Sequence, residues 1–528
     1  IGYAFAQHRA TSAEASATVE TTATIALAPE TAAAAPEADA RPRNRVVEEV
    51  VVTAQKREER LQDVPISIQA FSGDALAARG LDTTAELGQA VPGLQFTGVA
   101  GFTLVFIRGI GTDNFIPSAD PSVATYVDGI YLPAGQTTSQ ALGNVQRVEV
   151  LKGPQGTLFG RNATGGAISI VTEDPNEVFK ASLEAEGGNF QSRSGRVSVS
   201  GPITDWLAAG ISGLTMGKDS FYSASQFNTE DDELNAVRVK TVLRPMDDLS
   251  LSLTAFRSRQ RGLGSLIGNN TDPSLIGTAA GIMPSDDDYS SDSDFEANSK
   301  SRQDIYYGTL AWTLPWLDVK LIGSDQKTHQ QLAATDFDGS AIPIAAFDTT
   351  NEFARLATAE LQLLSNDNTP GVDSFQWVAG LYYLRSRAGF DPAHLTAAPG
   401  ALDAALAIAG VTLPDGLLDV FDAAPLVNTP LGENGIYLAL RGVMETRSYS
   451  AYAQGTYFFN EHFDFTLGGR LQREKRYLIQ SSTGAVAPIL NEEITLLNFG
   501  LPTPEIDENF SPKAVFSFHP RDNALLYA

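Results

Sequence analysis

From about residue 178 onward, apolar and polar side chains alternate along short segments of the chain. Three segments show this most clearly: residues 237–244, 249–254 and 463–467. In the first, Val237 and Val239 alternate with Arg238 and Lys240. Because successive side chains of a β-strand point to opposite faces, each segment predicts a strand with one apolar face and one polar face. A strand of about ten residues is long enough to cross a bilayer when it is tilted.

The connections between these strands alternate between short and long. Tight turns are expected at residues 201–205, 245–248, 314–316, 366–372, 459–461 and 520–523. Long segments are expected at residues 218–233, 259–303, 329–353, 387–446 and 475–508. This alternation is typical of outer-membrane β-barrels, whose turns lie in the periplasm and whose loops lie outside the cell. The chain therefore predicts a membrane all-β barrel.

Aromatic side chains near the expected strand ends predict girdles at the two membrane interfaces. They are Trp206, Tyr306, Tyr307, Trp312, Trp316, Phe458 and Phe459. Within a bilayer each unpaired backbone group costs several kcal/mol, so the strands of such a protein must close on themselves. We count about thirteen candidate strands, an odd number for such a barrel. The last one, residues 524–528, is cut short, so we expect the sequence to be incomplete at its C-terminus.

The first 54 residues follow another pattern. Residues 1–6 end in Ala4-Phe5-Ala6, which resembles the end of a secretory signal peptide and predicts export. Residues 7–45 have almost no large apolar side chains, so we expect a disordered leader. Residues 46–54 are a β-branched run of strand length that follows this leader directly.

Residues 55–175 predict a compact α+β domain punctuated by glycines. Strands are expected at residues 66–71, 103–107, 125–131, 147–151 and 167–172. One helix is expected from Ser72, whose hydroxyl can cap free amides, to Gly80. Another is expected from Thr84 to Ala90, before Pro92. The glycines from Gly153 to Gly166 are expected to permit tight turns and a close approach to the barrel wall.

Composition narrows the functional classes. The 528 residues carry a net charge of −26, which argues against nucleic acid as a partner. The sequence contains no cysteine, which excludes disulfides and thiolate sites. Its five histidines are scattered, so we expect no catalytic metal centre and no cofactor. The acidic run at residues 286–288 could bind calcium, although such runs are more often solvated. No hydrolase signature is present, so we expect no enzyme.

Residues 46–175 resemble the N-terminal part of TonB-dependent outer-membrane receptors. The first segment resembles the TonB box: Glu48, Glu49, Val50, Val51, Val52, Thr53 and Ala54. The domain after it resembles the plug, at residues 63–68, 91–94, 106–110, 126–131 and 145–168. Residues 360–365, 449–457, 467–470 and 511–527 resemble strands of the family. The resemblance implies a barrel of roughly 22 antiparallel strands filled by an α+β plug, of which about nine strands would be missing here.

This resemblance also implies partners and a function. The box would add as a strand to TonB, which is energised by its inner-membrane complex; the alternative is a first strand that packs within the plug. Plug cations Arg108 and Lys152 would pair with Glu360 of the barrel, and Asp113, Asn114 and Phe115 would contact the nutrient. We expect active import of a ferric siderophore by a protein embedded in outer-membrane lipid. Cobalamin, haem, an oligosaccharide or an aromatic compound remain alternatives, as does a surface binding protein without transport.

Overall fold

The computed structural model describes most of the chain after residue 50. The described residues are 23–26, 51–81, 83–99, 102–113, 118–133, 144–220, 223–224, 231–263, 290–291, 293, 298–336, 345–397, 436–487, 492–498, 503–521 and 524–528. Among them no helix is long and apolar enough to cross a membrane. Residues 1–6 and 48–50, for which export and TonB binding are expected, lie outside this set.

A 15-stranded antiparallel sheet forms the larger part of the molecule. Its main strands are β12 (Lys180–Gly187), β13 (Arg193–Thr204), β14 (Leu207–Lys218), β16 (Asp232–Met246), β17 (Leu249–Leu263), β19 (Asn298–Leu314), β20 (Leu317–Asp336), β21 (Ala345–Leu364), β22 (Phe375–Ala397), β23 (Ile436–Asn460), β24 (Phe463–Ala487), β26 (Glu505–Arg521) and β27 (Ala524–Tyr527). They follow one another in chain order, and β25 (Glu492–Asn498) pairs with the end of β24. The expected number of main strands is confirmed, and short connections are found at four of the six expected turns. The first turn lies at residues 205–206, because residues 201–204 of the expected turn still belong to β13, and residues 522–523 of the last lie outside the described part of the chain.

The strands are longer than expected. Instead of about ten residues, β23 and β24 each have 25. A tilted strand crosses a bilayer with about ten residues, so these two strands are more than twice as long as a membrane span requires. Two more described strands, β15 (Ser223–Ala224) and β18 (Ser290–Ser291), pair with each other in this region.

The expected leader contains one strand. Residues Ala23–Ala26 form β1 along the edge of β12, so this part is not unstructured as the composition had indicated. The edge of a sheet presents unpaired N–H and C=O groups, and a short β-capable segment can pair with them whatever its hydrophobicity.

The two faces of the sheet differ as the alternation predicts. Val237 is 41% exposed, whereas Lys240 on the opposite face is 7% exposed. Trp206, Trp312, Trp316 and Phe459 are exposed near the tight turns, as an interfacial girdle requires. Tyr307 is an exception and that prediction was wrong, because its strand parity directs it to the inner face, where it is buried.

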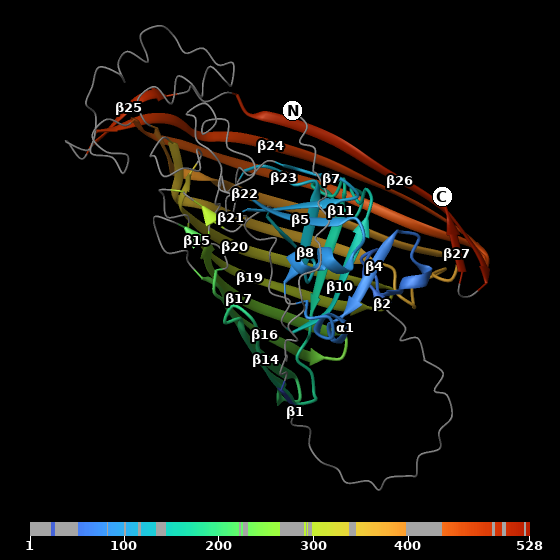
Figure 1. Ribbon diagram of the computed structural model, residues 1–528. Helices are drawn as coiled ribbons and strands as arrows, with labels where there is room; N and C mark the ends of the chain where they lie inside the picture. The colour runs from blue at the N-terminus through green and yellow to red at the C-terminus, as the bar shows by residue number, and fades with distance from the viewer. Residues whose placement is uncertain are drawn as a thin grey trace, which may run out of the picture.

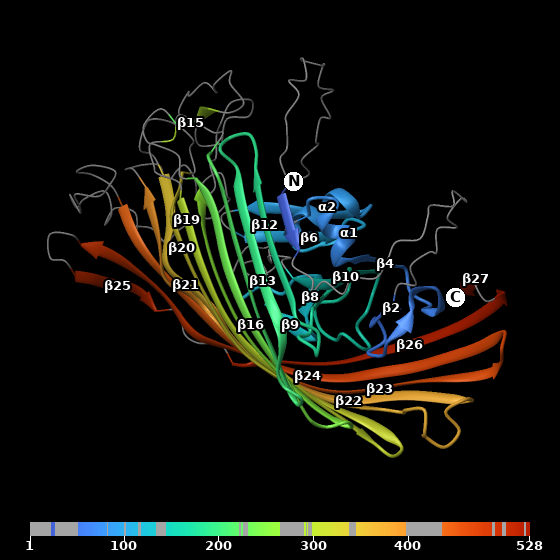
Figure 2. The ribbon, with the colours of Figure 1, turned by 90° about the horizontal axis from the view of Figure 1, so that it is seen from below.

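A smaller N-terminal domain lies against the concave face of the large sheet (Figures 1 and 2). Its central sheet has the order β4 (Ile68–Ser72), β10 (Val145–Lys152), β11 (Gly166–Thr172), β8 (Val123–Val127) and β9 (Ile130–Leu132). A second sheet contains β5 (Leu94–Val99), β6 (Phe102–Ile107) and β7 (Ile110–Gly111), and a third contains β2 (Val51–Val52) and β3 (Glu59–Arg60). The helical segments are η1 (Leu61–Asp63), α1 (Gly73–Ala77), η2 (Thr84–Glu86) and α2 (Leu87–Ala90).

Local sequence explains these helices and the contact between the two parts. Ser72 caps α1 by accepting a hydrogen bond from the amide of Ala75, as predicted. Val148 and Ile168 of the N-terminal domain share one buried apolar cluster with Phe256 and Ile322 of the large sheet. The N-terminal domain therefore packs on the sheet through a common core.

Candidate functional site

The contact between the N-terminal domain and the sheet is rich in charge, and one ionic contact is made by the turn from β8 to β9. Asp128 and Gly129 both have positive φ, 47° and 84°, the geometry of a tight hairpin turn that Asp-Gly favours. The Asp128 carboxylate accepts hydrogen bonds from Thr172 and from the Tyr307 hydroxyl, and it lies 3.2 Å from Lys240 Nζ. Burial alone would raise the pKa of Asp128, but Lys240 and these hydrogen bonds outweigh it and hold the pKa below its usual value.

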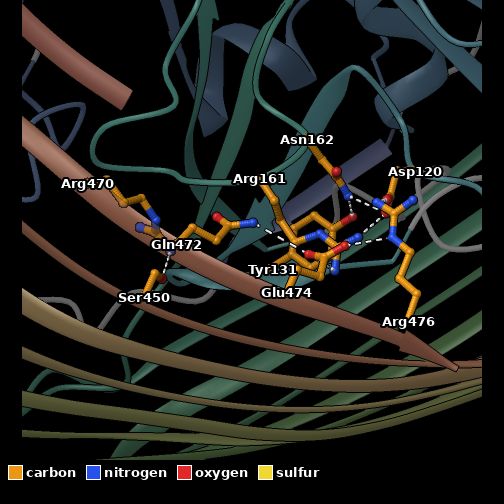
Figure 3. A network of polar contacts seen from close by, with 9 residues as sticks. All are labelled: Asp120, Tyr131, Arg161, Asn162, Ser450, Arg470, Gln472, Glu474 and Arg476. Atoms are coloured by element: carbon orange, nitrogen blue, oxygen red, sulfur yellow. Dashed lines mark hydrogen bonds and ion pairs between the residues drawn. The ribbon is translucent and has the colours of Figure 1, made fainter. Parts of the chain in front are cut away.

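A second ionic contact joins β24 to the glycine-rich segment after β10 (Figure 3). Arg161 forms an ion pair with Asp120 of its own domain and lies 3.1 Å from Glu474 of the sheet. Arg476 of the sheet in turn bonds Asp120 at 2.7 Å and Glu474 at 2.8 Å. Burial disfavours the charged form of Arg161, yet the two carboxylates raise its pKa above the ordinary value. Each side therefore contributes one cation and one anion to a closed four-charge network.

A third contact lies just beyond residues 51–54. Lys56, which has a φ of 65°, places its ammonium 3.4 Å from Glu360 of the sheet. Glu360 also accepts a hydrogen bond of 2.6 Å from the Tyr452 hydroxyl. The guanidinium of Arg57 donates to the backbone carbonyls of Ser365 and Trp377. The start of the N-terminal domain is thus bound to strands β21 and β22.

The predicted pairing of Arg108 and Lys152 with Glu360 is not the one found. Arg108 is exposed and donates to Ser67, and Lys152 donates to Gln69 and to the carbonyl of Pro92. Both cations lie on the same part of the domain, where Arg108 and burial lower the pKa of Lys152, burial contributing more. Glu360 does pair with a cation of the N-terminal domain, but that cation is Lys56.

The strand Val51–Val52 and the two residues after it are packed on the N-terminal domain. Val52 and Ala54 are fully buried, whereas Val51 is 39% exposed. The amide and the hydroxyl of Thr53 both donate to one oxygen of Glu149, at 2.9 and 3.1 Å. Glu149 lies on β10 and is ion-paired with Arg147 at 2.8 Å. A buried carboxylate on the second strand of the central sheet therefore holds this segment in place.

The predicted nutrient contacts are described only in part. Asp113 is exposed after β7, whereas Asn114 and Phe115 lie outside the described residues, as do the acidic residues 286–288. Within the described part of the chain no three His, Cys, Asp or Glu side chains are grouped so that they could hold a metal ion.

Comparisons with known proteins identify both parts of the fold. Residues 60–167 match the family model of the TonB-dependent receptor plug domain. The fold is similar to that of the ferric yersiniabactin uptake receptor FyuA from Yersinia pestis, with a TM-score of 0.66 and 20% identity over 88% of this chain and 63% of that one. The N-terminal domain of this chain is therefore similar to the plug domain of TonB-dependent receptors. The large sheet, called the wall below, has the fold of part of the FyuA structure.

Curated relatives match about a third of this chain or less. The pesticin receptor of Yersinia pestis is 36% identical over 166 residues, which cover 30% of this chain and 24% of the relative. The ferripyoverdine receptor of Pseudomonas aeruginosa is 28% identical over 145 residues, which cover 27% of this chain and 17% of the relative. The chain thus matches a quarter or less of the length of these relatives.

Most of the residues that form the ionic contacts between the N-terminal domain and the large sheet were not identified from the sequence. Lys240 and Glu474 nevertheless carry a signal, because each is a charge on the face of a strand opposite to exposed residues such as Val239 and Leu471. Parity alone therefore directs both charges toward the plug. Lys56 and Arg161 lie in loops, where no periodic pattern of residues indicates the direction in which a side chain points.

Proposed function

We propose that this chain is the plug and part of the wall of a receptor that imports ferric siderophores across the outer membrane, driven by TonB. The proposal is supported by the plug match and by the similarity to curated receptors for pesticin, ferripyoverdine and ferrioxamine B. The exposed apolar outer face of the sheet suits a bilayer.

The observation that carries the proposal is the hydrogen bonding of Thr53 to Glu149. Residues 48–54 are the proposed TonB-binding segment, and their described part forms only a two-residue ladder with β3. Such a short ladder is marginally stable, so a partner strand with a longer edge can compete for it by strand addition. Because Glu149 lies on β10, a pull on the box reaches the central sheet of the plug directly.

The ionic contacts with the wall define what such a pull must overcome. Removing one partner of a buried ion pair destabilises a protein by about 3–5 kcal/mol, because the remaining charge is left buried and uncompensated. The contacts at Lys240 and Glu474 lie on opposite parts of the sheet, on β16 and β24. We infer that the pull rearranges the segment nearest the box before the whole plug leaves the wall. The siderophore would bind on the long-loop side, with Asp113, Asn114 and Phe115 among its contacts.

The test is uptake of ⁵⁵Fe-labelled siderophores by cells that carry the full-length protein. Deletion of residues 48–54 should abolish energised uptake and leave binding at the cell surface intact. Deletion of seven residues from the leader, 30–36, is the matched control and should leave both unchanged. Uptake that survives the loss of residues 48–54 would refute the TonB-dependent mechanism. Binding of haem or cobalamin, but of no catecholate, hydroxamate or mixed-ligand iron chelate, would refute the substrate class.

A further inference from the structure

Lysine, arginine and histidine are absent from long stretches of the sequence on the side where the cargo is expected to bind. The stretches without any of these residues are 109–146 in the plug and, in and around the long connections, 219–237, 262–299, 331–354, 395–440 and 477–512. Each stretch contains Asp or Glu, among them Asp113, one of the proposed contacts. These parts of the chain are therefore negatively charged by composition, and no side chain in them could pair with an anionic cargo.

The inner face of the sheet shows the same depletion in a row of residues that are opposite one another on successive strands from β16 to β24. The row lies two residues beyond Phe256 and Ile305, which pack on the plug. Its members are Ala236, Ser258, Gln303, Thr328, Ala354, Ala388, Met444 and Leu478. None of these described side chains is charged. The cations of these strands, such as Arg257 and Arg259, alternate with the row and lie on the opposite face.

The next row away from the tight turns is also poor in charge. It contains Leu234, Gln260, Ser301, Gln330, Glu352, Phe390 and Gly442. The charged residue of this row, Glu352, is acidic. Gln260 is exposed and Ser301 is half-buried, so their amide and hydroxyl groups are accessible to a ligand.

The guanidinium groups between the plug and β24 are already neutralised. Arg161 is paired with Asp120 and Glu474, and Arg476 is paired with the same two carboxylates. An anionic ligand would have to displace a carboxylate from a buried ion pair and would leave that carboxylate uncompensated. This network therefore offers no free positive charge to a cargo.

The charge of a ferric chelate depends on its donor groups. Three hydroxamates each lose one proton and neutralise the ferric ion, whereas three catechols each lose two protons and give a strongly anionic complex. An anion that enters a site without cations loses its hydration and gains no partner. Acidic side chains also repel it over roughly 8 Å, the Debye length at physiological ionic strength.

We propose that the receptor is selective for ferric chelates without net negative charge, that is, for uncharged or cationic complexes of the hydroxamate type. This inference rests on the proposed import of ferric siderophores and narrows its substrate class. The amide of Gln260 and the hydroxyl of Ser301 can donate hydrogen bonds to the uncharged carbonyl groups of such a chelate and accept them from its amides. Neither group compensates the charge of a carboxylate or a catecholate.

The experiment measures binding of ⁵⁵Fe-labelled chelates to the purified full-length protein in neutral detergent. Ferrioxamine B is cationic, its N-acetyl derivative is uncharged and its N-succinyl derivative is anionic, while the iron centre stays the same. Ferrichrome is a second uncharged trishydroxamate, and ferric enterobactin is the anionic tris-catecholate. We expect the cationic and uncharged chelates to bind, the N-succinyl derivative to bind about tenfold more weakly than the N-acetyl derivative, and the catecholate not to bind. A rise in salt to about 0.5 M should narrow the tenfold difference, because salt screens the repulsion.

Two variants test whether the charge of the inner face is responsible. Ser301→Lys adds a cation to the inner face, and Gln331→Lys, the matched control, adds the same charge at an exposed position opposite Lys300 on the outer face. The readout is the ratio of the affinities for the N-succinyl and N-acetyl derivatives, which a loss of folded protein does not change. We expect Ser301→Lys to raise this ratio about tenfold and Gln331→Lys to leave it unchanged.

The outcomes separate the selectivity from the import itself. Anionic chelates that bind as tightly as uncharged ones, or the same ratio in Ser301→Lys and Gln331→Lys, would overturn the charge selectivity and leave siderophore import standing. Failure of every chelate to bind would overturn the proposed import, and the selectivity with it.

Discussion

Arg161 of the plug lies 3.1 Å from Glu474 of the barrel wall, and both side chains are almost completely buried. Asp120 and Arg476 complete the network, so two cations face two anions across the boundary between the plug and the wall. A buried charge is tolerated only when it is paired. The network therefore stabilises the plug only while its charges remain balanced.

This balance predicts different effects for single and double substitutions. Arg161→Met leaves Asp120 and Glu474 to share Arg476 and should weaken the plug by about 3–5 kcal/mol. Arg161→Met/Glu474→Gln leaves Asp120 paired with Arg476, so its cost should be smaller than that of the single change. Hydrogen exchange of the β10 amides, which reports the free energy of local opening, is the measurement. A double variant that is less stable than Arg161→Met would contradict the balanced-network interpretation.

The Asp128–Lys240 pair predicts a reversal of pH dependence. In the natural protein Lys240 helps to hold the pKa of Asp128 low. The stability that this carboxylate contributes is therefore present above its unfolded pKa of about 3.9 and is lost as the pH falls through the folded value. In Lys240→Met, burial without the cation should raise the pKa of Asp128, so the plug should become more stable as the pH falls from 8 to 5.

The measurement is the unfolding midpoint of the plug at several pH values in that range. Asp128→Asn/Lys240→Met removes the titrating group and should show no such dependence. If Lys240→Met and the double variant have parallel pH profiles, Asp128 is not the responsible group.

The fold of the wall was largely predictable from sequence, whereas the ionic contacts were not. Alternation of Val237 and Val239 with Arg238 and Lys240 gives both the strand and the face of each side chain, because the β-strand repeats every two residues. Strand length was not predictable in this way. In β24 the outward positions change from apolar at Phe465 and Leu471 to charged at Arg473, yet the strand continues to Ala487.

The charged side chains on the inner face of the sheet pair with residues that are far away in the sequence. Lys240 lies 112 residues from Asp128, and only the packing of the plug against the wall brings them together. Glu360 was expected to pair with a cation of the plug, but the cation found, Lys56, lies in a left-handed turn, and no periodicity reveals the direction of its side chain. The single strand expected at residues 125–131 was wrong: Asp128 and Gly129 form a hairpin turn between β8 and β9, which Asp-Gly between two apolar runs favours.

Glu149 provides a direct test of how the box is held. The sequence contains no cysteine, so single cysteines can be labelled cleanly with a water-soluble maleimide. Val52→Cys should react slowly because Val52 is fully buried, and Glu149→Ala should accelerate that reaction about tenfold by removing the acceptor for Thr53. Val51→Cys, at a half-exposed position, is the control and should react quickly in both backgrounds. Equally slow labelling of Val52→Cys with and without Glu149 would exclude this carboxylate as the retaining group.

Gly160 tests how closely the plug approaches the wall. Its φ is +80°, and a Cβ there would lie 2.5 Å from Cζ of Arg470 in β24. Gly153, with a φ of +94°, has nothing within 4 Å of the same position and is the matched control. Both alanine variants carry the cost of a left-handed residue, about 1–2 kcal/mol. Gly160→Ala should cost about 1–3 kcal/mol more, as overpacking does, measured as the unfolding free energy of the plug.

That additional cost should depend on Arg470. Its guanidinium donates to Ser450 and lies over the rings of Tyr382 and Tyr452, so it cannot move aside without losing these contacts. Arg470→Ala removes the obstruction. In the Arg470→Ala background, Gly160→Ala should therefore destabilise the plug no more than Gly153→Ala does. Such non-additivity is expected only for residues in direct contact. Additive costs of Gly160→Ala and Arg470→Ala would mean that Gly160 is required for its backbone conformation alone, and that the plug is not confined by the wall at this point.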